Sequence, residues 1–400
     1  IIPFFLAGAT ALAALTACIL GYAIFGAISG CSWNSWMRDL IPQNRLGAFF
    51  AKRMALMAGF GVVLNLSAGF YIDWFADYFH TAKVFGYSIL FLAGASAGLL
   101  GVYVISRIPE PRMPTTEKHL PFSAMLLQPF KEKNFRRLIM FQGAWNFAIN
   151  LAAPFFTVYM LTMLGLHMRA IITLQVLSQI MNLLFFRIWG RLSDRFSNKS
   201  VLSVAGPLYI ICIFVFTFTT LPNKYLLTMP LLIVIHIFMG IATAGVTLAT
   251  GNIGLKLAPQ GQATAYLAAN SLVNSTAAGI APILGGNFVD VFSDYALSWT
   301  VRWKSPAGEM TFETLDLQHW DFFFILACLV GLYAMHRLAK VKEVGEVEEE
   351  IVVLELIAEA RRFMLNLSTI AGLRAALQFP FSLLGTSFKR PNSQTKPGDT

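Results

Sequence analysis

The chain has 400 residues, of which 56% are hydrophobic and only 13% charged, and its formal net charge is +9. Soluble domains carry about 25% charged residues, so this composition excludes a water-soluble globular protein, and its high hydrophobicity excludes a disordered chain. The class that remains is an all-α polytopic membrane protein. The four cysteines lie in apolar runs without metal-ligand spacing, so we expect neither a metal site nor a disulfide framework.

Apolar segments predict nine complete transmembrane helices after an N-terminal helix remnant. Residues 1–36 would form a helix of about 54 Å, which exceeds one crossing of the bilayer. We therefore expect a remnant at 1–12, within a chain that has lost its true N-terminus, and a first complete span at 14–36. The further spans are expected at 54–76, 84–106, 137–163, 169–189, 200–220, 226–250, 265–290 and 321–339.

Basic residues orient these spans. If loop 37–53 is cytoplasmic, 25 of the 30 lysines and arginines fall on the cytoplasmic side and 5 outside. This asymmetry is the positive-inside pattern. It predicts a cytoplasmic C-terminus and an integral protein of the plasma membrane, which we expect to be a bacterial inner membrane. Because the cations are spread over short loops, they indicate topology, and no nucleic-acid partner is expected.

Proline and charge divide the chain. We expect residues 1–107 to be the remainder of an N-terminal helical bundle, 108–136 a cytoplasmic linker, and 137–340 a six-helix bundle. Residues 341–400 are expected to form a cytoplasmic tail with an amphipathic helix and then a disordered segment. In the outer loop, alternation around 298–303 and 310–315 predicts a small hairpin.

Two segments carry a family resemblance. Gly190-Arg191-Leu192-Ser193-Asp194-Arg195-Phe196-Ser197-Asn198-Lys199, followed by Leu202, resembles the loop signature of the major facilitator superfamily, with Ser197 in place of a glycine and Asn198 in place of a basic residue. Residues 33–42, which include Asp39, resemble the end of helix four in some bacterial members, together with the following Arg45, Gly47 and Arg53. The resemblance covers about residues 1–340 and implies a two-bundle fold, with the nine spans as helices four to twelve.

The signature suggests a gate. The carboxylate of Asp194 suits the positive N-terminus of a helix. By the pseudo-symmetry that the resemblance implies, its target would be the helix starting near Met54, beside Lys52 and Arg53. Making and breaking this contact would bias an alternating-access equilibrium. The alternative is that Arg191, Arg195 and Lys199 only set the topology.

Polar residues within the spans predict a cavity. Gln142, Asn146 and Asn150 follow one another at helical spacing beside Trp145, and amides facing lipid are costly, so this face is expected to point inward. The resemblance makes this span helix seven and the span of His236 helix ten, and both would line the central cavity. The cavity is therefore expected to include Gln142, Trp145, Asn146, Asn150, His236, Thr243 and Thr247.

The other polar and small residues of the spans are expected to pack helices together. These are Asn270 and Asn274, the group Gln175, Gln179 and Asn182, and the glycines of Gly26-x-x-x-Gly30 and Gly94-x-x-x-Gly98. For His236, a functional role and a neutral imidazole bonded to a neighbouring helix both remain open.

We expect a secondary active transporter that moves a small organic solute by alternating access. No carboxylate lies in the middle of a span, so proton or sodium coupling would depend on His236 or on helices outside this chain. No nucleophile–base constellation or phosphate loop is present, so neither an enzyme nor a cofactor is expected. We expect a monomer in the bilayer. The alternative is a non-transporting sensor or assembly scaffold that acts through the tail.

Overall fold

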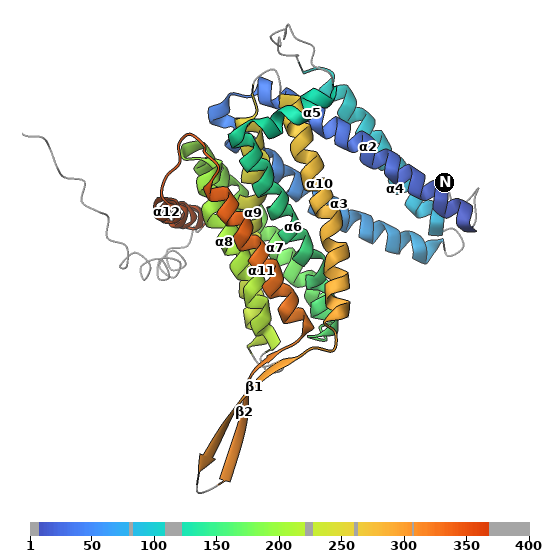
Figure 1. Ribbon diagram of the computed structural model, residues 1–400. Coiled ribbons are helices and arrows are strands. Elements are labelled where there is room, and N and C mark those ends of the chain that lie inside the picture. Colours follow the sequence, from blue (N-terminus) through green and yellow to red (C-terminus); the bar gives the residue numbers. More distant parts are fainter. Residues whose placement is uncertain are drawn as a thin grey trace, which may run out of the picture. The chain divides into compact units, whose positions relative to one another are not determined.

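The computed structural model describes residues 8–79, 83–108, 122–220, 227–259, 263–305 and 308–367. Ile1–Glu346 form one compact unit and Val347–Thr400 a second. Figure 1 labels the elements. The helices are α2 (Gly8–Leu40), η1 (Gln43–Arg45), α3 (Leu46–Tyr78), α4 (Lys83–Ile105), α5 (Phe122–Lys131), α6 (Lys133–Thr162), α7 (Met168–Arg195), α8 (Asn198–Phe216), η2 (Thr217–Thr220), α9 (Thr228–Leu257), α10 (Ala263–Val291), α11 (His319–Ala339) and α12 (Glu349–Leu367).

Within the described residues, eight helices are long and apolar enough to cross a membrane: α3, α4 and α6 to α11. The all-α polytopic fold is therefore confirmed. The predicted break between a remnant and a first span is wrong, because α2 runs without interruption over 33 residues. Residues 8–37 contain neither a proline nor a charge that would end a helix. Residues 1–7 of the predicted remnant lie outside the described residues.

Helices α6 to α11 pack into a bundle with aromatic side chains at its centre. Trp145, Trp189 and Tyr159 are fully buried. The Trp189 indole donates a hydrogen bond of 2.9 Å to the Ile241 carbonyl and so links α7 to α9. At Gly240, a Cβ would overlap the Ser178 carbonyl of α7, so only glycine allows these two helices to approach so closely. This bundle positions the polar side chains described below.

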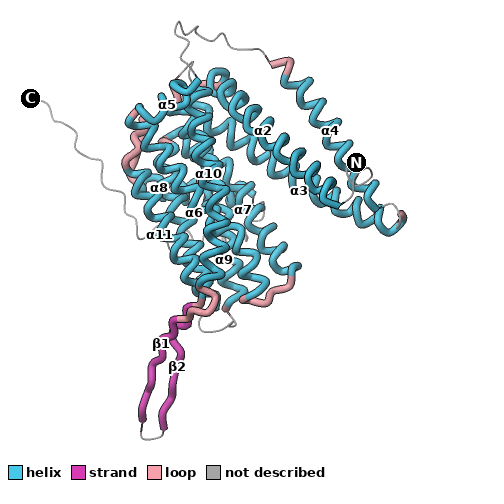
Figure 2. Tube along the Cα trace, turned by 45° about the vertical axis from the view of Figure 1, so that its right-hand side comes forward, coloured by secondary structure: helices cyan, strands magenta, loops and turns pink. Residues whose placement is uncertain are grey.

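Helices α2, α3 and α4 lie beside that bundle (Figures 1 and 2). Helix α2 contacts α10, and α3 contacts α7. Many large apolar side chains of α3 and α4 are exposed, such as Phe60 and Phe91 at 66% and 80%. Surfaces of this kind suit the hydrocarbon of a bilayer.

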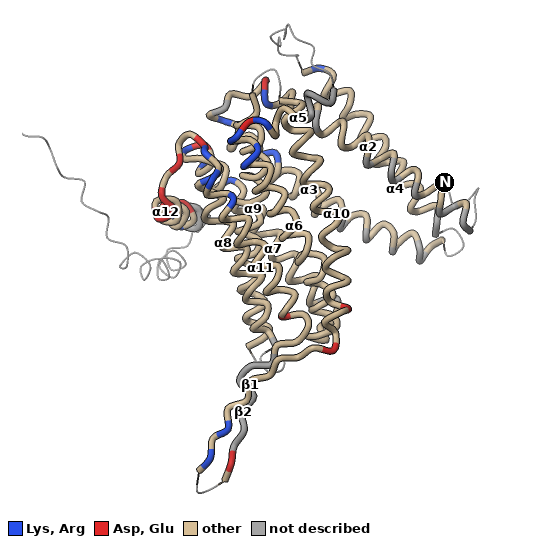
Figure 3. Tube along the Cα trace, viewed as in Figure 1, with Lys and Arg blue, Asp and Glu red and all other residues tan. Residues whose placement is uncertain are grey.

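The two ends of the bundle differ. At one end, strands β1 (Leu297–Ser305) and β2 (Gly308–Leu317) form an antiparallel hairpin with Trp303 opposite Met310, which confirms the hairpin predicted from alternation (Figure 2). Lysines and arginines gather at the opposite end, where α5 lies (Figure 3). We call these the hairpin end and the basic end.

The second unit contains α12, Glu349–Leu367. The amphipathic helix was expected to continue to about residue 377, and residues 368–400 lie outside the described part of the chain. Residues 341–346, the first of the predicted tail, belong to the bundle unit.

Candidate functional site

The signature lies on helices, not in a loop. Helix α7 continues to Arg195 and α8 begins at Asn198, so only Phe196 and Ser197 separate them. Ser197 has an extended backbone with φ −159°, and its hydroxyl accepts a hydrogen bond of 3.0 Å from the Ser200 amide. Serine at the position of the usual glycine therefore caps α8, and the turn does not need a glycine.

The carboxylate of Asp194 lies at the N-terminus of α3. Its Oδ1 accepts from the Gly47 amide at 2.7 Å, and its Oδ2 accepts from the Ala48 amide at 2.6 Å. These amides belong to the first turn of the helix and have no partner within it. Since α3 begins at Leu46, the target starts eight residues earlier than the Met54 expected from the sequence. The charge of Asp194 complements the positive end of the α3 dipole.

Two glycines bring α3 and α7 together here. A Cβ at Gly47 would lie 2.6 Å from Asp194 Oδ1 and 2.8 Å from the Gly190 carbonyl, and a Cβ at Gly190 would overlap the Ala51 Cβ. Any side chain at either position would force the helices apart. Gly47 and Gly190 therefore permit the contact that Asp194 makes.

The other residues of the two segments surround this contact. Leu192 is buried in the core. Arg45 ends η1, just before α3. The guanidinium of Arg53 lies 4.0 Å from the centre of the Trp33 ring, which is a cation–π contact. Arg195 lies over Phe196. Asp39 lies next to the last residue of α2, near the basic end.

Two further hydrogen bonds join α2 to the bundle near the same end. The Arg38 guanidinium donates to the Ala258 carbonyl at 3.3 Å, and the Thr264 hydroxyl donates to the Ser35 hydroxyl at 2.8 Å. Together with the Asp194 contact, they hold α2 and α3 against α7, α9 and α10 at the basic end.

A cavity of about 400 Å³ lies between α2, α6, α9 and α10. Of the predicted cavity residues, Gln142, Asn146 and Thr247 line it. Sequence reasoning did not assign Asn34 or Ser271 to a cavity, although both line this one. We call this the amide cavity, and its polar lining is Asn34, Gln142, Asn146, Thr247, Thr250, Asn270, Ser271 and Asn274.

Gln142 is the centre of the amide cavity. Its Nε2 donates to the Thr250 carbonyl of α9 at 2.8 Å, and its Oε1 accepts from the side-chain amides of Asn270 and Asn274 on α10 at 2.7 and 2.9 Å. Asn270 and Asn274 thus pack helices, as expected, and also line the cavity. Among the described contacts, the buried Oδ1 atoms of both asparagines accept no hydrogen bond.

Four predicted members lie outside this lining: Trp145, Asn150, and His236 with Thr243, which line another cavity. Asn150 donates to the Asn146 carbonyl of its own helix at 2.8 Å. Trp145 packs in the core against Phe141 and Tyr209. The expectation that Gly26 and Gly30 pack closely is wrong for the described chain, because both line the amide cavity and a Cβ at either would meet nothing within 4 Å.

His236 and Thr243 line a separate cavity of about 290 Å³ between α6, α7 and α9, with Gln175, Gln179 and Asn182. The buried imidazole bonds through Nδ1 to the Leu232 carbonyl at 2.8 Å, on its own helix and not on a neighbouring one. We call this the histidine cavity. The predicted single site is therefore divided into two. Among the described residues, no three His, Cys, Asp or Glu side chains are grouped to hold a metal.

Comparison with known proteins identifies the family. The family model for the Major Facilitator Superfamily matches residues 1–282 and again 147–388. The chain belongs to the Major Facilitator Superfamily. Two overlapping matches fit the repeated halves from which this superfamily is built. The chain is thus an integral membrane protein of a transporter superfamily.

A solved structure supports the fold of this superfamily member. The crystal structure of a bacterial homologue of the iron transporter ferroportin, in the outward-facing state, matches with a TM-score of 0.55 at 14% identity, over 78% of this chain and 68% of that one. At this identity the likeness shows the fold alone. No curated protein matches the sequence.

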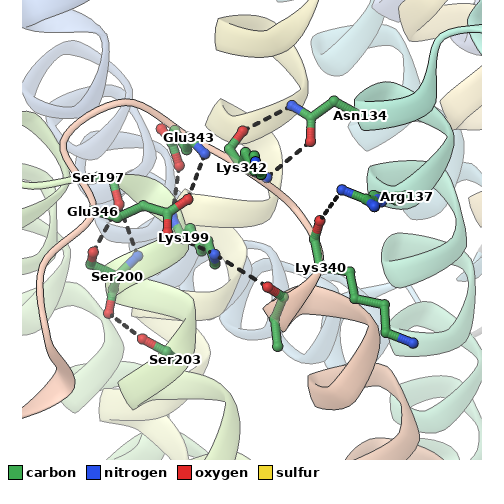
Figure 4. Close-up of polar contacts among 11 residues, drawn as sticks. Asn134, Arg137, Ser197, Lys199, Ser200, Ser203, Lys340, Lys342, Glu343 and Glu346 are labelled. Atoms are coloured by element: carbon green, nitrogen blue, oxygen red, sulfur yellow. Dashed lines mark hydrogen bonds and ion pairs between the residues drawn. The ribbon is translucent and has the colours of Figure 1, made fainter.

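A strap after α11 completes the basic end of this Major Facilitator Superfamily chain (Figure 4). The strap is formed by residues 340–346. Its Glu343 accepts from the Asn198 side chain and from the Lys199 amide, both at 2.8 Å, and so caps α8. Lys199 Nζ pairs with Glu346 at 2.8 Å. Sequence reasoning missed both glutamates, because an acidic run at the start of a tail resembles a solvated segment.

Further contacts fix the strap. The Lys342 backbone exchanges two hydrogen bonds with the Asn134 side chain, at 2.8 and 2.9 Å, and Arg137 donates to the Lys340 carbonyl at 3.0 Å. Partial burial alone would raise the pKa of Glu346. The hydrogen bonds from Lys199 and from the Glu343 amide, with the charges of Lys199 and Lys342, outweigh it and lower the pKa below its usual 4.5. The ionised carboxylate therefore holds the strap.

Proposed function

We propose that the chain is a secondary active transporter that moves a small, uncharged, polar solute by alternating access. The observation that carries the proposal is the amide cavity, which lies between α2 on one side and α6, α9 and α10 on the other. A site between two groups of helices is where a rocking motion would change access.

The lining supports an uncharged solute. None of its described residues is charged, so a strongly ionic solute would lack a partner in a medium where buried charge is costly. The Oδ1 atoms of Asn270 and Asn274 are buried acceptors without a hydrogen bond among the described contacts. A solute with hydroxyl or amide donors would satisfy them and remove the cost of leaving them unpaired.

The contacts at the basic end would serve as the gate. Asp194, Arg38 and Ser35 join α2 and α3 to the bundle there. By the positive-inside rule this end would face the cytoplasm of a bacterial cell, with the C-terminus on the same side. In this arrangement the cytoplasmic end is closed, and breaking these bonds would open it.

Coupling to protons would use the histidine cavity. His236 is the titratable side chain among the described residues that line either cavity. Vesicle flux driven by a proton gradient should therefore be lost in His236→Gln and kept in His167→Gln, at the junction before α7. Gradient-driven flux that persists in His236→Gln contradicts this assignment.

Thermal stabilisation of the full chain by a panel of polyols, sugars and amides tests the substrate class. We expect a neutral polar compound to raise the melting temperature of the wild type and of Asn287→Leu, an exposed position on α10. Asn274→Leu should lose the shift, because it removes an amide of the cavity. Stabilisation by charged compounds alone, or an equal shift in all three proteins, contradicts the proposal.

A non-transporting scaffold is the second candidate, because Val347–Thr400 form a compact unit of their own. Deletion of this unit separates the two functions. Saturable flux in vesicles that survives the deletion supports the transporter. Absence of flux in the full chain, with a partner that is lost on deletion, supports the scaffold.

A further inference from the structure

A large groove lies between α3 and α7, beside their contact. Its volume is about 1000 Å³, at the upper end of ordinary ligand pockets of about 300–1,000 Å³. Most of its wall is apolar and comes from α3. Leu56, Phe60 and Val63 line it with side chains that are 53%, 66% and 60% exposed, and Leu183 of α7 lies opposite.

The groove is basic at one end. Lys52 of α3 and Arg187 and Arg191 of α7 line it near the basic end of the molecule. The two arginines are four residues apart and share a helix face. None of the lining residues that the structure describes is acidic. The nearby carboxylate of Asp194 is engaged with the Gly47 and Ala48 amides.

Both walls belong to segments that are long and apolar enough to cross a membrane, 46–64 of α3 and 170–195 of α7. An occupant therefore meets cations near the membrane surface and an apolar wall toward the centre of the bilayer. A small soluble anion would use the cations and leave the apolar wall uncovered. A neutral lipid would cover the wall but would bring no anionic group to the basic end of the groove.

We propose that this groove binds an anionic phospholipid of the surrounding leaflet. The phosphate lies between Lys52, Arg187 and Arg191, since arginine offers a planar fork that matches phosphate oxygens. An acyl chain covers Leu56, Phe60 and Val63. Because the cations come from both walls, the headgroup joins α3 to α7 within two helical turns of the Asp194 contact. The lipid thus reinforces the same helix pair that the two glycines bring together.

Native mass spectrometry of the full chain in neutral detergent tests the site. After incubation with equal amounts of phosphatidylglycerol and phosphatidylcholine, we expect at least a tenfold preference for phosphatidylglycerol. The triple variant Lys52→Gln, Arg187→Gln, Arg191→Gln should lose it. The matched triple variant Lys131→Gln, Lys133→Gln, Arg136→Gln removes three exposed cations of the same end outside the groove and should keep it.

Three results would each overturn the proposal. The first is equal retention of the two lipids by the wild type, and the second is an equal loss of preference in both triple variants. The third is displacement of phosphatidylglycerol by millimolar inorganic phosphate or glycerol phosphate, which would indicate a site for a small anion.

A second pair of variants tests the acyl-chain part. Gly59 lines the groove, and a Cβ there would meet nothing within 4 Å, so Gly59→Leu would fill the groove without disturbing the helices. Gly61→Leu is the matched control, because a Cβ there also meets open space, outside the groove lining. We expect phosphatidylglycerol retention to fall at least fivefold in Gly59→Leu and to stay at the wild-type level in Gly61→Leu. Unchanged retention in Gly59→Leu contradicts acyl-chain binding.

Discussion

Asp194 and Glu343 each cap the N-terminus of a helix with a carboxylate, but the contacts around the two carboxylates differ. Asp194 accepts from the first turn of α3, and Glu343 accepts from the first turn of α8, all at 2.6 to 2.8 Å. Asp194 joins two groups of helices. Glu343 stays within one bundle and also contacts the Asn198 side chain at 2.8 Å and Lys256 at 3.8 Å.

The two caps differ in the number of other contacts that support them. If Glu343 were removed, the strap would keep the bonds from Asn134 and Arg137 and the bond between Lys199 and Glu346. The Asp194 cap depends on two glycines and on one carboxylate, so a small change removes it. A single helix cap is worth about 0.5–2 kcal/mol, which is suited to a contact that has to open. The Glu343 cap is supported by the other contacts of the strap, so we call it a clamp, a contact that is expected to stay closed.

The largest effect is expected from Gly47→Ala. The new Cβ would lie 2.6 Å from Asp194 Oδ1 and 2.8 Å from the Gly190 carbonyl, so α3 has to move away and both hydrogen bonds break. A cysteine introduced at Ser271 in the amide cavity, in a background without native cysteines, reports the opening. We expect its labelling from the basic side by a membrane-impermeant thiol reagent to rise about tenfold, equivalent to about 1.4 kcal/mol.

Gly61→Ala is the control, since a Cβ there meets nothing within 4 Å. Equal labelling in Gly47→Ala, Gly61→Ala and the wild type would contradict the view that close approach of α3 and α7 closes the basic end.

A smaller effect of the same sign is expected from Asp194→Asn. The amide oxygen still accepts from one backbone amide, but the charge at the α3 N-terminus is lost, which costs about 0.3–2 kcal/mol. We expect labelling at Ser271→Cys to rise about threefold. Asp290→Asn, an exposed carboxylate on α10 near the hairpin end, is the matched control. Transport and labelling at wild-type rates in Asp194→Asn would remove the gating role.

Glu343→Gln should leave the gate unchanged and weaken the strap. Because the other strap contacts remain, we expect a loss of about 1 kcal/mol in stability, faster proteolysis after residue 346, and wild-type labelling at Ser271→Cys. Glu348→Gln removes an exposed charge just beyond the strap and should change neither. If Glu343→Gln opened the amide cavity as strongly as Asp194→Asn, the distinction between gate and clamp would be wrong.

The smallest effect is the pH dependence of the strap. The pKa of Glu346 is lowered in the folded chain, so its stabilising contribution is complete above the unfolded pKa of about 4.5 and is lost as the pH falls through the folded pKa. The pair with Lys199 is 37% exposed on the Glu346 side, so it contributes no more than about 0.2–1 kcal/mol.

Hydrogen exchange of the Glu343 backbone amide reports the protonation of Glu346, because this amide donates a hydrogen bond of 2.7 Å to the Glu346 carboxylate. After correction for intrinsic rates, exchange should rise as the pH falls below 4.5 in the wild type. In Glu346→Gln, whose side chain does not titrate, the corrected exchange rate should not change with pH. A pH-independent wild type would show that the ion pair does not hold the strap.

The sequence predicted those features that depend on a local, periodic pattern of apolar and polar residues. Apolar runs and strand alternation predicted the membrane class and the hairpin. It failed at helix ends: α3 begins at Leu46, in a basic segment that hydropathy assigns to a loop, because helices extend beyond the bilayer. The inward face of Gln142 was predictable, but its partners Thr250, Asn270 and Asn274 were not, since they are more than 100 residues away.

Glu343 shows the same limit more strongly. Its partners lie 144 and 145 residues earlier in the chain, and nothing in its local sequence distinguishes it from the other acidic residues around it. The division between the amide and histidine cavities was equally hidden, because a helical stripe gives a direction but not the neighbouring helices. By contrast, the role of Asp194 was predicted, because the signature marks this carboxylate as one that contacts the N-terminus of a helix.

The hairpin has a practical consequence. Its two strands, of nine and ten residues, project from the hairpin end (Figure 2) and extend roughly 30 Å. Leu297, Trp299, Val301 and Trp303 alternate along β1 and form one exposed apolar face. Helical membrane bundles of this size offer few landmarks outside a detergent micelle for aligning particle images. An antibody fragment raised against this projection would mark the orientation of each molecule without touching the cavities or the basic end.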